Sequence, residues 1–72
     1  MKCPVCEGQA TNITSPDFDG TVFRCDKCKE YEIAGGYMER LLSLNREDRA
    51  RVLDKAKRFA RHGRPSINSM CF

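Results

Sequence analysis

Four cysteines form two identical pairs in the first part of the chain. Two residues separate Cys3 from Cys6 and Cys25 from Cys28, and eighteen residues lie between the pairs. Two intervening residues let both sulfurs of a tight turn point at one ion, and two such turns complete a tetrahedral site with no open position for water. The spacing therefore predicts one structural Zn²⁺ ion, ligated by all four cysteines.

Other uses of these thiols are also compatible with the sequence. A redox dithiol normally needs a single C-x2-C motif within a βαβ pattern, which is absent here. Iron is a second alternative, because rubredoxin-like knuckles also use four cysteines. His62 is a third candidate ligand, although a lone histidine on a polar helix face is usually only solvated. Cys71 is expected to be a free thiol, and a redox-sensing module would rest on it alone.

The length of the chain also favours a metal. A domain near 72 residues buries only about 60% of the surface that its unfolded chain exposes, so a covalent or metal staple helps it fold. The N-terminus has no charged segment followed by an apolar stretch, so we expect no secretory signal, a cytoplasmic location and reduced thiols. No apolar run approaches the roughly 18 residues of a membrane span, so we expect no membrane partner.

Charge is unevenly distributed along the chain. Residues 1–45 carry five basic and seven acidic side chains, for a net charge of −2, whereas residues 46–72 carry eight basic and three acidic ones, for a net charge of +5. Four thiolates and one Zn²⁺ lower the N-terminal part by a further two units. Only the C-terminal third is therefore expected to present an electropositive surface.

The first half of the chain reads as short strands. We expect strands at residues 9–14, 21–25 and 29–33, with a turn at residues 15–20. The last of these alternates glutamates with Tyr31 and Ile33, as in a strand with one solvated face. Phe18, at the tip of the hairpin, could stack on a base or insert into a protein partner, but it is expected to fold back over the small core. The glycine pair at residues 35–36 ends this pattern.

The second half reads as helical. Apolar residues recur at helical spacing over residues 36–44, and a longer helix is expected over residues 46–62, with Asn45 as its N-cap. The apolar stripe of the longer helix comprises Val52, Leu53, Ala56, Phe59 and Ala60. The predicted fold is a small, metal-stabilised α+β domain: a three-stranded ribbon over residues 1–34, two helices over residues 35–64, and a flexible tail over residues 65–72.

The order of knuckle, hairpin, knuckle and third strand resembles the zinc ribbons of prokaryotic and phage proteins. Residues 3–8, Cys-Pro-Val-Cys-Glu-Gly, match the usual first knuckle of that class. The second knuckle departs from it, because Lys29 stands where a glycine is common and would need a positive φ. Size and layout are also similar to Ogr-type phage transcription activators, whose second cysteine pair is more widely spaced. The resemblance implies a four-cysteine zinc site and a role in DNA binding or transcription regulation.

The basic C-terminal helix could contact the phosphates of a nucleic acid. The candidate contacts are Arg51, Lys55, Arg58, Arg61, His62 and Arg64. The competing interpretation is a solvated surface, since Glu47 can pair with Arg51, and Asp54 with Arg58, at i,i+4 spacing. Arg61, His62 and Arg64 have no acidic residue four positions away.

No set of residues suggests catalysis. The chain has one histidine and no glycine-rich phosphate loop, and no nucleophile stands beside a base with an orienting acid. We therefore expect a binding protein with no small-molecule substrate. The alternative to nucleic-acid binding is an adaptor that docks on a protein partner or forms a homodimer, with a purely structural zinc site.

Overall fold

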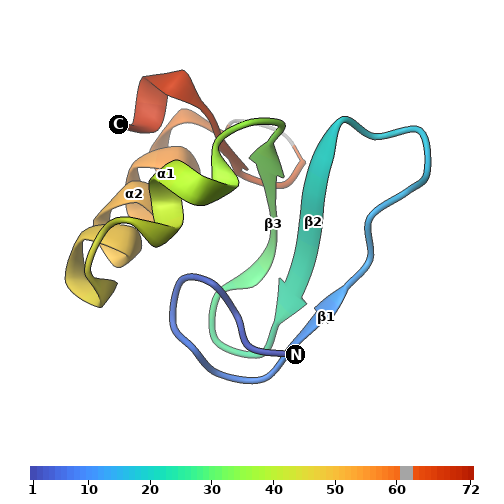
Figure 1. Cartoon of the computed structure of the whole chain (residues 1–72), viewed down its shortest axis with the longest axis horizontal. Coiled ribbons are helices and arrows are strands. Elements are labelled where there is room, and N and C mark those ends of the chain that lie inside the picture. Colours follow the sequence, from blue (N-terminus) through green and yellow to red (C-terminus); the bar gives the residue numbers. More distant parts are fainter. Residues whose placement is uncertain (61–62) are drawn as a thin grey trace.

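The computed structural model describes residues 1–60 and 63–72. Its centre is a four-stranded sheet in the order β1-β2-β3-β4 (Figure 1). The strands are β1 (Ala10–Asn12), β2 (Gly20–Cys25), β3 (Lys29–Ala34) and β4 (Ser66–Ile67). The first three are antiparallel neighbours, and β4 runs parallel to β3. Residues from the two ends of the chain therefore meet in one sheet.

The alternation along β3 gives the sheet an inner face. Tyr31 and Ile33 are buried, while Glu30 and Glu32 are only partly covered on the opposite side. This agrees with the sequence prediction, because successive side chains of a strand point to opposite faces. At the start of β2, Gly20 has φ +140°, and a Cβ there would lie 2.3 Å from the Ile33 carbonyl oxygen. Only glycine fits this position.

Two helices lie on the β3 side of the molecule, away from β1 (Figure 1). They are α1 (Met38–Leu42) and α2 (Arg46–Phe59). The Asn45 side chain caps α2 as predicted, accepting a hydrogen bond of 2.8 Å from the backbone N–H of Asp48. Within the described ranges 1–60 and 63–72, neither helix has the length and apolar character needed to cross a membrane.

The expected three-stranded ribbon with two helices is not confirmed, because the sheet has a fourth strand and, in the part of the chain that the structure describes, only α2 is a helix of several turns. The end of α2 also differs from the prediction. Ala60 is already extended, with ψ 116°, so the helix ends at Phe59, which is 54% exposed and not part of the core. The chain leaves the helix here to return towards β3. Arg61 and His62 lie outside the described residues.

The C-terminal residues, expected to form a flexible tail, instead pack against the sheet. The backbone N–H of Glu32 donates a 2.9 Å hydrogen bond to the Pro65 carbonyl, and Ile67 pairs with Ile33. Ile67 is fully buried, and the short 3₁₀-helix η1 (Ser69–Cys71) follows it. A buried isoleucine removes apolar surface from water, which stabilises a strand of only two residues.

Arg64 ties this returning segment to the outer face of the sheet. Its Nε donates to Glu32 Oε1 at 2.8 Å, and its Nη1 lies 3.5 Å from Glu30 Oε2. The Glu32 hydrogen bond raises the pKa of the guanidinium. The guanidinium also lies 5.6 Å from the ring centroid of Phe18, which is half-buried rather than projecting from the hairpin tip. Arg64 therefore links Phe18 and the glutamates of β3 to the segment that leads into β4.

Candidate metal centre

The four paired cysteines converge on one point. Their Sγ atoms all lie within 4.8 Å of one another. The Sγ atoms of Cys6 and Cys25 are 3.5 Å apart, and those of Cys3 and Cys28 are 3.9 Å apart. A tetrahedron with metal–sulfur distances of about 2.3 Å has edges of about 3.8 Å. The donor set therefore fits a tetrahedral metal ion.

The same distances bear on the redox alternative. Two short sulfur–sulfur contacts join cysteines of different pairs, Cys6 to Cys25 and Cys3 to Cys28. A C-x2-C redox site would instead bring together the two sulfurs of one motif. All five cysteines are free thiols. The arrangement is that of one four-sulfur cluster rather than two dithiols.

Short turns present the sulfurs. In the first knuckle, the Cys3 N–H donates to the Gly8 carbonyl at 2.7 Å, and the Glu7 N–H donates to the Cys3 carbonyl at 2.8 Å. In the second, Cys25 is the last residue of β2 and pairs in register with Lys29, the first residue of β3. Each cysteine pair is thus positioned by a backbone turn.

Both knuckles have a left-handed residue directly after their second cysteine. Glu7 has φ 63° and Lys29 has φ 67°. The prediction for Lys29 is confirmed, whereas the equivalent conformation at Glu7 was not anticipated from the sequence. Left-handed backbone costs a non-glycine residue roughly 1–2 kcal/mol. It persists where the surrounding hydrogen bonds over-determine the turn.

Backbone N–H groups point at the sulfurs. The Gly8 N–H donates to Cys6 Sγ at 3.4 Å, and a Cβ at Gly8 would lie only 3.3 Å from that sulfur, so glycine permits this approach. The backbone N–H groups of Cys28 and Lys27 lower the pKa of the Cys25 thiol. Such hydrogen bonds favour the thiolate, the form that binds metals.

The thiols of the cluster differ in acidity. Burial raises the pKa of Cys28 and of Cys6. Burial also acts to raise the pKa of Cys25, but the N–H groups of Cys28 and Lys27 outweigh it and lower that pKa to about 7. Cys25 therefore loses its proton more readily than Cys6 and Cys28, whose protons a metal ion must displace.

Metal affinity is therefore expected to weaken as the pH falls. A bound metal holds the thiolates ionised far below their ordinary pKa, so its stabilisation is present at alkaline and neutral pH and is lost on acidification. Each displaced proton contributes roughly tenfold per pH unit to the apparent dissociation constant. Competition titrations with a zinc-binding dye at pH 6.0 and 7.5 should show this weakening. A pH-independent affinity would contradict the protonated state of Cys6 and Cys28.

Tyr31 lies directly behind the cluster. Its hydroxyl is 3.0 Å from Cys3 Sγ, and the side chain is fully buried. Burial raises the pKa of Tyr31, so its hydroxyl keeps its proton. A metal-bound thiolate at Cys3 has no proton, and the hydroxyl must then be the donor. The sequence had indicated Tyr31 only as a core residue, because nothing in the strand pattern shows where its hydroxyl points.

Tyr31→Phe is expected to weaken zinc binding by about 10- to 100-fold, the usual effect of losing an outer-shell partner. The ring and most of its packing remain, so the change isolates the hydroxyl. Tyr37→Phe is the matched control, since the Tyr37 ring stacks on Phe72 with centroids 5.9 Å apart and should bind zinc unchanged. Dye competition measures both. Equal affinities for the two variants would remove Tyr31 from the metal site.

No family model, curated protein or solved structure matches this chain. The metal centre therefore rests on its own geometry. Four cysteines close together, three of them buried, could hold a metal in a structural role.

The remaining cysteine does not extend the site. Cys71 is buried, and its thiol lies 3.5 Å from the Ser66 carbonyl oxygen, where it can donate a weak hydrogen bond. It is not among the four clustered sulfurs. The suggestion that His62 replaces a ligand concerns a residue outside the described part of the chain.

The predicted phosphate contacts on α2 are largely neutralised within the protein. Arg51 lies 3.1 Å from Glu47 and 3.5 Å from Asp48, and Arg58 lies 3.0 Å from Asp54. The other predicted contacts are Lys55, Arg61, His62 and Arg64. Arg64 pairs with the sheet glutamates, Lys55 is exposed, and Arg61 and His62 are outside the described residues. Among the described residues of this set, Arg51, Arg58 and Arg64 are paired with carboxylates, so these residues do not form one unpaired basic face.

Proposed function

We propose that this protein is a non-catalytic, zinc-stabilised nucleic-acid-binding protein, of the kind that regulates transcription. The four-sulfur cluster carries the proposal, because its closed tetrahedral spacing suits an ion that stabilises structure rather than one that activates water. Zinc is preferred over iron as the commonest occupant of such sites. The knuckle–hairpin–knuckle order, which resembles phage and bacterial zinc ribbons, supports this assignment.

Nucleic acid is the proposed partner because of the charge distribution. Residues 46–72 carry a net charge of +5, and clustered lysine and arginine provide most of the sequence-independent affinity for phosphates. The ion pairs at Arg51 and Arg58 reduce this charge on one face of α2 and leave it on others. Binding a nucleic acid also requires no catalytic residues in the protein.

Two measurements test this function. Native mass spectrometry of the purified protein should show one zinc ion per chain. Fluorescence anisotropy with labelled single-stranded and duplex DNA, at 50 and 200 mM NaCl, should show binding that weakens steeply with salt. Affinity weaker than millimolar at low salt, or binding without salt dependence, would refute the nucleic-acid role and leave the metal site intact.

A protein-interaction adaptor is the second candidate. An apolar groove of about 400 Å³ lies beside the first knuckle, and its apolar lining residues include Met1, Pro4, Phe23, Met38 and Leu42. Met1 is 62% exposed and Leu42 47% exposed. Light scattering on the metallated protein distinguishes the two functions, since a salt-insensitive homodimer without DNA affinity would favour the adaptor.

A further inference from the structure

The charges of α2 separate into faces of different character. The helix advances about 100° per residue, so Glu47, Arg51, Asp54 and Arg58 share its outer face. Their ion pairs, at 3.1 and 3.0 Å, leave that face without net charge. Arg46 and Lys57 are eleven residues apart, which returns to nearly the same direction after three turns. These two cations therefore share one flank.

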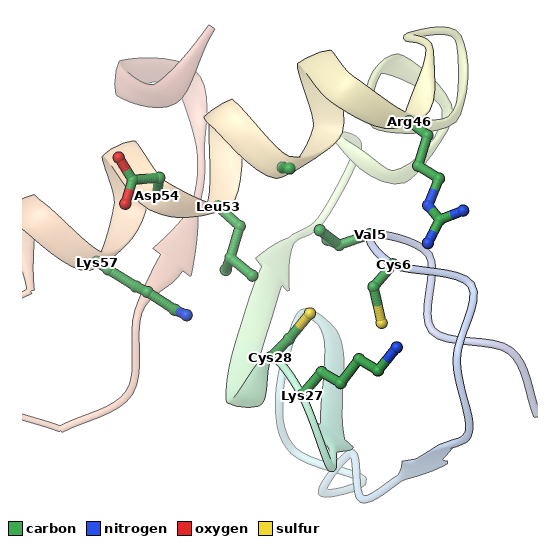
Figure 2. A pocket seen from close by; sticks show the side chains of 9 residues that line it. Val5, Cys6, Lys27, Cys28, Arg46, Leu53, Asp54 and Lys57 are labelled. Carbon is green, nitrogen blue, oxygen red and sulfur yellow. The ribbon is translucent and has the colours of Figure 1, made fainter.

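This flank faces the metal centre. An open groove of about 330 Å³ lies between α2 and the knuckles, and its lining includes Lys27, Arg46 and Lys57 together with Cys6 and Cys28. Figure 2 shows the Arg46 guanidinium pointing down towards Cys6, the Lys27 amine just below that sulfur, and the Lys57 amine extending towards Cys28. The three cations come from two separate parts of the chain and surround one space.

These three cations are not neutralised by carboxylates. Among the ion pairs of residues 1–60 and 63–72, none involves Lys27, Arg46 or Lys57. Asp54 is the only acidic residue in the groove lining, and its carboxylate is already 3.0 Å from Arg58. In Figure 2 that carboxylate points away from the two cysteines. The groove therefore keeps its positive charge.

The metal centre itself sets how much of this charge is available. Zn²⁺ with four thiolates carries a net charge of −2, and the three side chains supply +3. One positive charge is left over beside the centre, and one phosphodiester group carries one negative charge. A phosphate in the groove would thus complete the local charge balance.

We propose that this groove, rather than the outer face of α2, binds the phosphodiester backbone of a nucleic acid. This inference rests on the proposed nucleic-acid-binding function and assigns its contact residues as Lys27, Arg46 and Lys57. Such contacts carry no base specificity, so they provide affinity and position the chain on the strand. They also place the bound backbone next to the metal centre. Lys27 belongs to that centre's second knuckle, between Cys25 and Cys28.

Two triple variants test the assignment in the zinc-loaded, full-length chain. Lys27→Gln/Arg46→Gln/Lys57→Gln removes three exposed cations of the groove, and Arg51→Gln/Lys55→Gln/Arg58→Gln removes three exposed cations elsewhere on α2. Both lower the net charge by three. In anisotropy titrations with a labelled 20-nucleotide single strand, the groove variant should bind at least about tenfold more weakly, with a salt slope flattened by about 2. The control should change by less than about threefold.

An NMR titration of the unmodified zinc protein with an eight-nucleotide oligothymidylate locates the contacts without any substitution. The largest amide shifts are expected at Lys27, Arg46, Ala50 and Lys57. Shifts concentrated at Arg51, Lys55 and Arg58, or equal losses in the two triple variants, would overturn the groove assignment while the nucleic-acid function stands. If the groove variant loses zinc and the groove amides do not shift, the cations only balance the metal centre, which also overturns it. A wild-type protein that binds no DNA would refute the proposed function itself.

Discussion

Replacing Cys28 by serine is expected to abolish zinc retention and unfold the protein. Cys28 is buried and belongs to the cluster of four sulfurs that lie within 4.8 Å of one another. Structural zinc contributes apparent binding energies of about 10–16 kcal/mol in zinc-finger peptides. Whole domains are stable by only about 5–15 kcal/mol. Loss of one ligand therefore removes stabilisation comparable to the total.

Native mass spectrometry and far-ultraviolet circular dichroism measure this effect. Cys71→Ser is the matched control, because Cys71 is also a buried thiol but is not in the cluster. It should keep one zinc ion and a folded spectrum. If Cys28→Ser keeps the spectrum of the unmodified protein, apolar burial rather than a metal organises the first half of the chain.

Ile67→Ala is expected to destabilise the zinc-loaded protein by about 2–4 kcal/mol, as for other fully buried isoleucines. Ile67 is completely buried in β4 and pairs with Ile33 of β3. Its truncation leaves a cavity where the returning chain meets the sheet. The residues after Arg64 would then lose a fully buried side chain that attaches them to the domain.

Urea unfolding at a fixed free zinc concentration measures this cost. Met70→Ala is the control from the same segment, since Met70 is 64% exposed and exposed substitutions usually change stability by less than about 0.5 kcal/mol. Similar stabilities for the two variants would mean that β4 contributes nothing and that the segment behaves as a tail.

The metal centre and the core are not separate parts of this molecule. Cys3, Cys25 and Cys28 belong to the same buried cluster as Tyr31 and Leu41. Zinc loss would therefore expose apolar surface as well as thiols. Because of this coupling, acidification should lower the zinc affinity and the free energy of unfolding together.

The sequence by itself determined the features that arise within short segments. The cysteine spacing predicted one four-sulfur site, because each knuckle is a local turn. The alternation in residues 29–33 predicted the buried side of β3, and Asn45 predicted the start of α2. The i,i+4 pairs of Arg51 and Arg58 could also be anticipated, because helix geometry fixes which side chains are neighbours.

Only the tertiary structure decided the contacts between distant segments. The Tyr31 hydroxyl reaches Cys3 across 28 residues, and Arg64 reaches Glu32 across 32 residues. β4 forms because Ile67 pairs with Ile33 of β3. A strand of two residues is too short for its side-chain alternation to be recognised in the sequence. The unpaired cations Lys27 and Lys57 gather at one groove for the same reason. Periodicity in the sequence indicates which side of an element is apolar. Packing of the whole chain decides which residues contact that side and the opposite one.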